Sequence, residues 1–346
     1  MRVWFRRSIS LVALAYPVVL SAIALALHLV GERWWLTGAS LYLPRILFAA
    51  PLPVIVVATL ACRMRRLAAA QLLSAALILF PLMGLVLPAP RFTRRSGPTI
   101  RVLSLNADSA RAGVETLVAA IDGYSPDLVL LQEVYGNVTS RLASALRARY
   151  PNVDTTDQFV VASRLPLSSV VTPDRFLYDS RPHSARYMRY VATTPFGPVV
   201  IYNVHPISPR QGFYSLRGAG LRREIASGRL FEGAAAPVVQ ANSGLRAAEL
   251  EALSQDVRQQ QGPVLVAGDT NLPGLSPLLR WLTDGYQDGF EKAGWGFGYT
   301  FPSGRPWMRI DRMFASSQLT FDRFEVGCAG ASDHLCVVAD LRRSPR

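Results

Sequence analysis

The feature that most limits the folds open to this chain is the apolar character of its first 90 residues. Residues 9–30 form a run of 22 residues without an acidic or basic side chain other than His28. As a helix, such a run crosses the hydrocarbon core of a bilayer at about 1.5 Å per residue. Residues 46–62 form a shorter run that contains Pro51 and Pro53, and residues 67–87 again have a spanning length. The sequence therefore predicts a segment, 1–90, with three transmembrane helices.

A cleaved signal peptide is the alternative interpretation of the first run. Arg6 and Arg7 precede the run, and the small residues Ala24 and Ala26 resemble a cleavage site. The run is longer than the apolar core of a usual signal peptide, and further apolar segments follow it. These two facts favour a membrane-spanning helix.

The charges beside the apolar runs predict their orientation. Segment 1–90 holds eight of the 37 basic residues and only one of the 24 acidic residues, Glu32. Most of these basic residues precede the first run or separate the second from the third: Arg2, Arg6, Arg7, Arg63, Arg65 and Arg66. Positive charge near the ends of spans marks the cytoplasmic side. We therefore expect a multi-pass protein of the cell membrane whose remaining domain is extracytoplasmic, although Arg91, Arg94 and Arg95 argue for the opposite orientation.

The rest of the chain predicts a single large domain. Residues 91–99 are a polar linker, and strand and helix patterns alternate over residues 100–346, which is typical of a layered α/β domain. A long insertion at about 207–242 fits neither pattern, and such insertions are often functional. Strands are expected at residues 100–106, 128–131, 159–162, 188–193, 199–204, 264–267, 310–314, 321–326 and 335–341, and helices at about 112–121, 139–150 and 245–260.

Polar side chains occur repeatedly at the ends of the predicted strands. In the stretch VLVAGDTN, Gly268 ends an apolar strand, and Asp269 and Asn271 follow it. Taken alone, this is an ordinary polar turn. The same arrangement recurs at five other strand ends, with Asn106 and Asp108, Glu133, His205, Asp311, and Asp333 with His334. This repetition indicates a functional site.

The residue types at these ends favour one kind of chemistry. Carboxylates and amides, without cysteine or paired histidine ligands, suit a hard cation such as Mg²⁺ or Mn²⁺ better than zinc. Phosphoryl hydrolysis needs such a cation together with a carboxylate that orients water and with donors for the developing negative charge. The sequence therefore predicts a metal-dependent phosphoesterase or phosphohydrolase.

The ordered motifs LNAD, QEV, NVH, GDTN, RIDRMF and SDH resemble the endonuclease/exonuclease/phosphatase superfamily. This is the fold of deoxyribonuclease I, apurinic endonucleases, neutral sphingomyelinases and inositol polyphosphate 5-phosphatases. The resemblance covers about residues 100–341. It implies a DNase I-like, four-layered α/β sandwich with the site at one end of two packed sheets.

The resemblance also implies a role for each matched residue. Glu133 would be the main metal ligand, supported by Asn106, Asp108 and Asp333. Asp269 would align or deprotonate the attacking water, and Asn271 would hold the phosphate or the water. His334, oriented by Asp311, and His205 would contact the phosphate. His205 resembles the nuclease and sphingomyelinase branches, and it could also serve as general acid for the leaving group.

Three hypotheses about the function remain open at this point. Three spans followed by an external domain resemble VanJ-type bacterial proteins associated with glycopeptide (teicoplanin) resistance, which implies a lipid-linked phosphate or diphosphate such as undecaprenyl diphosphate. A membrane-tethered nuclease is the second hypothesis, with Arg210, Arg217, Arg222 and Arg223 as part of a basic groove, and a sphingomyelinase-like phosphodiesterase is related to it. The third is a non-catalytic membrane scaffold, which the intact motif set disfavours. No protein partner is inferred.

The cysteines leave one question open. Cys328 and Cys336 lie eight residues apart on either side of Asp333 and His334, and they could bridge if the domain lies in an oxidising compartment. Sequence alone does not supply the Cα separation that such a bridge requires.

Overall fold

The computed structural model describes residues 2–87, 97–173, 177–178, 181–182, 184–214 and 235–345. Most of the predicted linker 91–99 and residues 215–234 of the predicted insertion therefore lie outside the described residues. The chain divides into two compact units. The N-terminal unit contains Met1–Val86, Gly212–Ser243 and Pro273–Pro277, and the sandwich unit contains Leu87–Gln211, Gly244–Leu272 and Leu278–Arg346.

The N-terminal unit contains two helices that are long and apolar enough to cross a membrane, Val3–Leu29 and Arg65–Leu82. The first belongs to α1 (Arg2–Leu29), and the second combines α4 (Arg65–Leu77) with a π-helical turn (Ile78–Leu82). Most apolar side chains of α1 are exposed. These features are consistent with membrane association.

The middle apolar run differs from its prediction. Helix α3 covers only Pro51–Ala61, and a 3₁₀ turn (Arg45–Ala49) precedes it. Pro51 begins the helix, because a proline is tolerated at the first helical position but ends any helix that approaches from the N-terminal side. Eleven residues rise by only about 16 Å. Among the described residues, the expected three spanning helices are therefore reduced to two by length, with a shorter apolar helix between them.

Polar groups within these helices have partners. Gln71 Nε2 donates to the carbonyl oxygen of Ala13 on α1 (2.9 Å), and Ser74 Oγ donates to Gln71 Oε1 (3.0 Å). Hydrogen bonds of this kind join apolar helices in lipid, where an unsatisfied polar group is costly. They fix the pairing of α1 with α4.

The N-terminal unit also holds the loop Pro273–Pro277. Glu32, in the 3₁₀ turn Gly31–Arg33, accepts a hydrogen bond from Ser276 Oγ (2.6 Å), and Arg45 donates to the carbonyl oxygen of Gly274 (3.2 Å). A Cβ at Gly31 would lie 2.2 Å from the Pro277 ring, so only glycine allows this approach. A loop that follows the GDTN motif is thus bound by residues between α1 and α3, near the short helix α2 (Trp35–Ser40).

The predicted insertion is partly helical. Helix α7 covers Arg210–Tyr214, and α9 covers Ala235–Gln259, ten residues more at its start than the helix expected at 245–260. The mixture of glycine, alanine and arginine with isolated apolar residues suggested an irregular segment, but Val239 is buried and the helix begins at Ala235. Pro237 lies in the first turn, where its missing N–H costs little.

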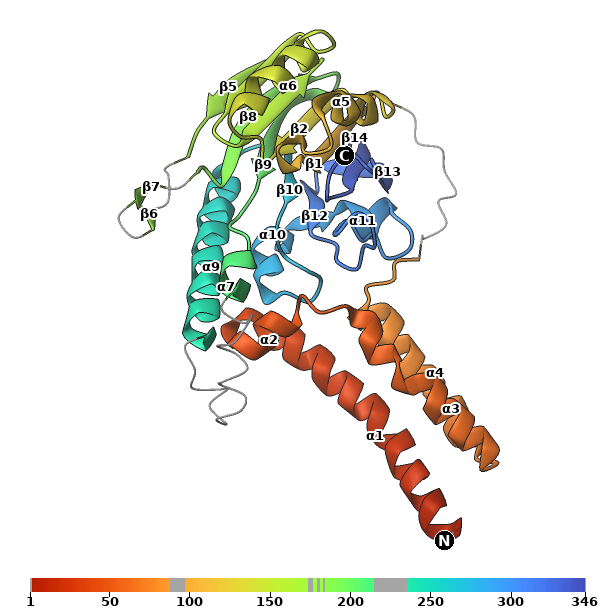
Figure 1. The fold of residues 1–346 in the computed structure, drawn as a ribbon. Coiled ribbons are helices and arrows are strands. Elements are labelled where there is room, and N and C mark those ends of the chain that lie inside the picture. Colours follow the sequence, from red (N-terminus) through yellow and green to blue (C-terminus); the bar gives the residue numbers. More distant parts are fainter. Residues whose placement is uncertain are drawn as a thin grey trace. The chain divides into compact units, whose positions relative to one another are not determined.

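The sandwich unit contains two six-stranded sheets (Figure 1). The first has the order β13-β14-β1-β2-β4-β3, and the second has the order β11-β12-β10-β9-β8-β5. The strands of the first sheet are β13 (Leu319–Gly327), β14 (Cys336–Arg343), β1 (Ile100–Asn106), β2 (Leu128–Gln132), β4 (Phe159–Ser163) and β3 (Asn152–Thr156). Those of the second are β11 (Tyr286–Asp288), β12 (Asp311–Ser316), β10 (Val264–Asp269), β9 (Gly197–Val204), β8 (Tyr187–Thr194) and β5 (Leu167–Val171). The short strands β6 (Leu177–Tyr178) and β7 (Arg181–Pro182) pair separately.

Helices cover the outer faces of the two sheets. Helices α5 (Val114–Asp122) and α6 (Asn137–Arg147) share a buried apolar cluster with β1, β2 and β4. On the second sheet, Leu250, Leu253 and Val257 of α9 and Leu282 of α10 (Arg280–Thr283) pack against β9 and β10. A further short helix, α11 (Gly289–Ala293), follows β11. The predicted α/β sandwich is confirmed, with helices, two sheets and helices in succession.

Strand directions bring the polar ends together. The pairs β1–β2 and β9–β10 are parallel, so that Asn106, Gln132, Val204 and Asp269 all end their strands at one edge. The antiparallel strand β12 begins at the same edge, with Asp311 opposite Asp269. Catalytic groups in layered sheets commonly gather where such strand ends meet.

A buried polar bridge joins the two sheets just behind this edge. Gln132 Nε2 donates to Asn203 Oδ1 (2.6 Å) and to Ser104 Oγ (3.1 Å), and Asn203 Nδ2 donates to the carbonyl oxygen of Leu131 (3.1 Å). All three side chains are fully buried. Because such groups are costly without partners, this network fixes one relative position of the sheets.

Gly268 allows the closest approach of backbone segments in the second sheet. Its φ is +151°, and a Cβ would lie 2.0 Å from the carbonyl oxygen of Val204 on β9. We expect Gly268→Ala to lower the free energy of unfolding by more than about 3 kcal/mol, because backbone of a central strand would have to move. Chemical denaturation measures this loss. Gly304→Ala is the control, since a Cβ there meets no atom within 4 Å, and equal stability of the two variants would contradict the expectation.

Candidate active site

Asp269 lies at the centre of the site. Its side chain is 1% exposed. Oδ2 accepts a hydrogen bond from Asn106 Nδ2 across the two sheets (3.1 Å), and Oδ1 accepts from the backbone N–H of Asn271 (2.8 Å). The pKa of Asp269 is raised, chiefly by burial and also by the charge of Asp311, while His334 and His205 act in the opposite direction. The carboxylate is thus rigidly oriented and close to two groups that stabilise its charge.

Two histidines direct Nε2 towards the same oxygen of Asp269. His205 Nε2 is 3.6 Å from Asp269 Oδ2, and His334 Nε2 is 3.8 Å from it. Both rings are buried. The arrangement places a carboxylate between two nitrogen atoms that can hold or release a proton.

Asp311 orients His334. Nδ1 of the ring is 2.9 Å and 3.1 Å from the two oxygens of Asp311, which leaves Nε2 facing Asp269. Burial lowers the pKa of His334, but Asp311 and Asp269 more than offset this and raise it to about 10. The ring is therefore an imidazolium at neutral pH, able to donate from Nε2 to an anionic oxygen.

Gln158 orients His205, a contact that sequence reasoning missed. Gln158 Nε2 donates to the carbonyl oxygen of Ala185 (2.7 Å), which presents Oε1 to His205 Nδ1 at 2.5 Å. Tyr135 also donates to this Oε1 (2.9 Å). The second ring nitrogen of His205 then faces Glu133 Oε1 at 3.2 Å and makes no hydrogen bond of good geometry. Gln158 lies 47 residues from His205 in the sequence, and no motif marks it.

Glu133 presents an ionised carboxylate beside the histidines. Burial raises its pKa, but His205 and Asn106 more than offset this and lower the pKa to about 2. Its φ of 54° is uncommon for a residue with a side chain, and Asp108 (43°) and Asn271 (51°) share this feature. Such backbone conformations cluster at functional sites, where they aim side chains that a regular strand would direct elsewhere.

Asp108 and Asp333 complete a group of negative charges. Burial raises the pKa of Asp108, and the charges of Asp333 and Glu133 raise it further. Asp333 is more exposed and forms an ion pair with Arg210 (3.3 Å). Asn106 Oδ1 accepts from the backbone N–H of Asp108 (3.1 Å). The structure thus brings together all nine residues predicted from the sequence, and their individual roles stay predictions.

Asn271 differs in one detail from its expected use. Its Nδ2 donates to the carbonyl oxygen of Pro206 (3.0 Å), the residue after His205. A phosphate contact through Nδ2 would therefore use the second N–H of the amide. The hydrogen bond also ties the end of β10 to the end of β9.

Comparison with known proteins fits this geometry. The model of the endonuclease/exonuclease/phosphatase family matches residues 102–334. This chain belongs to that family. No curated protein matches the chain by sequence.

Several solved structures are similar to this chain. An endonuclease/exonuclease/phosphatase from Beutenbergia cavernae DSM 12333 is 21% identical, covers 71% of this chain and 72% of its own, and has a TM-score of 0.50. Truncated TDP2 from Caenorhabditis elegans is 18% identical over 70% and 97% of the two chains, with a TM-score of 0.46. A protein of the same family name from Bacteroides vulgatus is 15% identical over 72% and 100%, with a TM-score of 0.48. The similarity to the first structure concerns the fold alone.

The donor set of this family member fits a divalent metal ion. The family is metal-dependent, and Glu133, Asp108, Asp333 and Asn106 offer hard oxygen donors. Burial raises the pKa of Asp108, and the negative charges of Asp333 and Glu133 raise it further, so that carboxylates repel one another around Asp108. A cation would relieve this repulsion. The atoms of Asp269, Asp311 and His334 also lie within 4.8 Å of one another, but Asp311 is engaged with His334 Nδ1, so that this trio is better suited to proton handling.

Arg210 and Phe301 form a second feature that sequence reasoning missed in part. The Phe301 ring packs on His334 with centroids 4.6 Å apart, and the Arg210 guanidinium lies 5.7 Å from the Phe301 centroid. Arg210 was predicted as a basic residue of the insertion, whereas Phe301 lies in an aromatic-rich loop between the GDTN and RIDRMF motifs. Together they form one wall beside His334.

The raised pKa of His334 gives a testable pH dependence. If its imidazolium assists hydrolysis, activity of this family member should persist through neutral pH and fall as pH rises through about 10. The same group contributes stability fully below its unfolded pKa of about 6.5, and this contribution is lost as pH rises through the folded value. Asp311→Asn removes the first neighbour that raises the pKa, so the alkaline limb of kcat should move to lower pH. An unchanged limb in this variant would contradict the assignment.

Proposed function

We propose that this chain is a membrane-anchored, divalent-metal-dependent hydrolase of a lipid-linked phosphate or diphosphate, acting at the outer face of the membrane. One observation carries the reaction class: a buried Asp269 between two histidine Nε2 atoms, beside the oxygen cluster of Glu133, Asp108 and Asp333. The apolar helices α1 and α4 support the lipid part of the proposal. An architecture like that of VanJ-type proteins favours an undecaprenyl diphosphate-like substrate.

Each residue of the site has its own role in the proposed reaction. A bound Mg²⁺ or Mn²⁺ would neutralise phosphoryl oxygens, and Glu133 with Asp108, Asn106 and Asp333 would hold it. Asp269 accepts a proton from water and orients it for attack on phosphorus, since its own oxygens are fixed by Asn106 and Asn271. His334 donates a hydrogen bond to the developing negative charge. His205, whose Nε2 lies in the site, protonates the leaving oxygen.

The disulfide supports the outward orientation. Cys328 and Cys336 are bonded, with Cα atoms 5.4 Å apart. The bridge closes the loop that carries Asp333 and His334. Disulfides persist in oxidising compartments and are rare in the cytosol. This agrees with the orientation predicted from the arginines beside α1 and α4.

A nuclease is the second candidate. Arg210 over Phe301 combines a cation and an aromatic ring beside His334, which suits a stacked base and a backbone phosphate. Arg217, Arg222 and Arg223, the other basic residues expected in this groove, lie outside the described residues. A sphingomyelinase-like phosphodiesterase would use the same site.

A phosphate-release screen on the detergent-purified full chain tests the proposal. Substrates are undecaprenyl diphosphate, undecaprenyl phosphate, sphingomyelin and plasmid DNA, each with Mg²⁺, with Mn²⁺ and with a chelator. We expect metal-dependent release of phosphate from the isoprenoid lipids. Nicking of DNA without lipid hydrolysis would replace the proposal by the nuclease, and choline phosphate release from sphingomyelin would replace it by the phosphodiesterase.

A further inference from the structure

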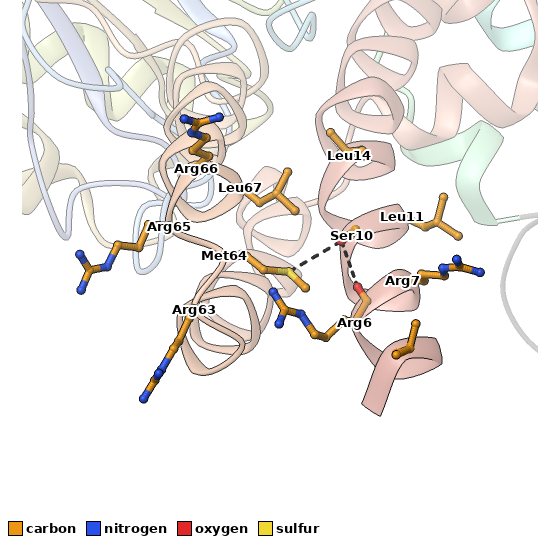
Figure 2. A pocket seen from close by; sticks show the side chains of 11 residues that line it. Arg6, Arg7, Ser10, Leu11, Leu14, Arg63, Met64, Arg65, Arg66 and Leu67 are labelled. Atoms are coloured by element: carbon orange, nitrogen blue, oxygen red, sulfur yellow. Dashed lines mark hydrogen bonds between the residues drawn. The ribbon is translucent and has the colours of Figure 1, made fainter. Parts of the chain in front are cut away.

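A groove of about 930 Å³ lies at the N-terminal end of α1, far in sequence from the motifs of the active site. The first turns of α1 form one wall, and the connection from α3 into α4 forms the other (Figure 2). Ser10 Oγ contacts Met64 Sδ across it (3.7 Å). The groove is as large as common ligand sites. Its basic residues are Arg6, Arg7, Arg63, Arg65 and Arg66.

These arginines have no acidic partner among the described residues. All five are exposed, and none takes part in an ion pair within the part of the chain that the structure describes. Glu32 is the one acidic residue of segment 1–90, and it is buried against Ser276. In Figure 2, Arg6 extends from α1 towards the α3–α4 connection, while Arg63, Arg65 and Arg66 spread from that connection. The groove therefore concentrates positive charge without internal compensation.

Two of the arginines occupy an unfavourable place in a helix. Arg65 and Arg66 are the first residues of α4, whose first turn contains no acidic residue and whose N-cap, Met64, makes no side-chain cap. The N-terminus of a helix carries partial positive charge, so cations there are destabilising and an anion is stabilising. Orientation in the membrane would require only positive charge near the span ends. The first turn of α4 instead suits a bound anion.

The remaining walls are apolar. Leu11 and Leu14 of α1 are exposed, and in Figure 2 Leu14 and Leu67 of α4 lie between the two helices, whereas Leu11 points to the other side of α1. These side chains lead from the arginines towards the middle of the apolar helices. An anion seated here would thus have room for acyl chains along α1 and α4, which is the geometry of a phospholipid with a charged headgroup.

We propose that this groove binds the phosphate headgroup of an anionic phospholipid, with its acyl chains along α1 and α4. The site is separate from the hydrolytic centre, and it rests on the membrane anchoring in the proposed function but not on the hydrolysis. Its ligand is a structural or recruiting lipid rather than a substrate, since no carboxylate or histidine of the groove could activate water. The groove would anchor the N-terminal unit in membrane regions rich in anionic lipid.

Native mass spectrometry of the full chain tests this site. The detergent-purified protein is mixed with equal amounts of phosphatidylglycerol and phosphatidylcholine that carry identical acyl chains. We expect at least about tenfold more phosphatidylglycerol retained, because each arginine near an anionic lipid contributes roughly fivefold in affinity. The triple variant Arg63→Gln, Arg65→Gln, Arg66→Gln should retain the two lipids nearly equally. Equal retention by the unmodified chain would overturn the proposal.

Matched variants separate the site from general charge effects. Replacing the exposed Arg147, Arg258 and Arg343 of the sandwich unit by glutamine removes the same charge and should leave the lipid preference intact. If the triple groove variant proves unstable, the double variant Arg6→Gln, Arg7→Gln removes charge from α1 alone and should still reduce the preference. A preference that survives both groove variants would refute the site.

Two further experiments test which ligand the groove binds and whether binding is independent of the hydrolytic site. Glycerophosphoglycerol and inorganic phosphate, added in excess, should not displace the lipid, and full displacement by either would show that the groove binds free phosphates and would overturn the lipid assignment. Asp269→Asn should lower the rate of phosphate release at least about 100-fold and leave phosphatidylglycerol retention unchanged. The two readouts therefore distinguish failure of this proposal from failure of the proposed function.

Discussion

Asp269→Asn should lower kcat for phosphate release by a factor of about 10² to 10⁴, the range that a positioned general base contributes. The amide keeps the size of the side chain but cannot accept a proton from water. Asn106 Nδ2 and the backbone N–H of Asn271 both donate to the present carboxylate. The measurement is steady-state phosphate release at saturating metal, with the thermal midpoint recorded in parallel.

The matched control for Asp269 is Asp284→Asn. The Asp284 side chain is 78% exposed, and its ion-pair partner within the described part of the chain is Arg258 at 3.5 Å, so its loss should change neither rate nor stability. A fall of less than tenfold in the folded Asp269 variant would exclude its assigned role as the base. A complementation test with the same variant addresses the scaffold hypothesis, since an unchanged phenotype would mean that hydrolysis is not the function.

Glu133→Gln should weaken activation by Mg²⁺ or Mn²⁺ more than any other single change. Glu133 is the carboxylate with its pKa lowered to about 2, so it carries a full charge at every pH above about 4. Removal of that charge should raise the metal concentration for half-maximal activity by at least about 100-fold, since loss of even a residue that supports a ligand costs 10- to 100-fold. Metal titration of the initial rate and calorimetric metal binding measure this change.

Glu115→Gln is the control for this second change. Glu115 lies on α5 with its side chain 84% exposed. Its replacement by glutamine removes one negative charge and leaves the residues of the site unchanged. We expect its metal activation curve to match that of the unmodified chain. If Glu133→Gln lowered the rate of phosphate release but left the metal activation curve unchanged, the carboxylate would act on the substrate rather than on the metal.

The positions of the nine site residues could be predicted because they depend on local rules. An apolar strand followed by glycine and polar residues, as in VLVAGDTN, marks both a strand end and the side chains that leave it. Parallel pairing of β1 with β2 and of β9 with β10 then puts these ends at one edge. The ends of the expected strands agree with the observed ones to within two residues, whereas the edge strands β3, β5 and β11 were not expected.

Contacts between distant segments could not be predicted in this way. Gln158 lies in the turn between β3 and β4 of the first sheet, yet it contacts His205 at the end of β9 in the second sheet. Nothing in its local sequence distinguishes it from a surface glutamine. The early start of α9 was missed since Pro237 and Gly244 weaken the local helix signal, while burial of Val239 within the unit outweighs them. The middle apolar run was overestimated because hydropathy counts residues and does not register where Pro51 restarts the helix.

The loop Pro273–Pro277 has a practical consequence for anyone who prepares the sandwich unit as a soluble fragment. Leu272 alone separates this loop from Asn271, yet the partners of the loop, Glu32 and Arg45, lie before residue 97. A fragment that starts at Gly97 would leave Ser276 and Gly274 without those hydrogen bonds. The end of the GDTN turn would then be free to sample other backbone conformations. Kinetic constants measured on such a fragment would describe a site whose GDTN turn is less well ordered. The full chain in detergent or lipid is the proper reference.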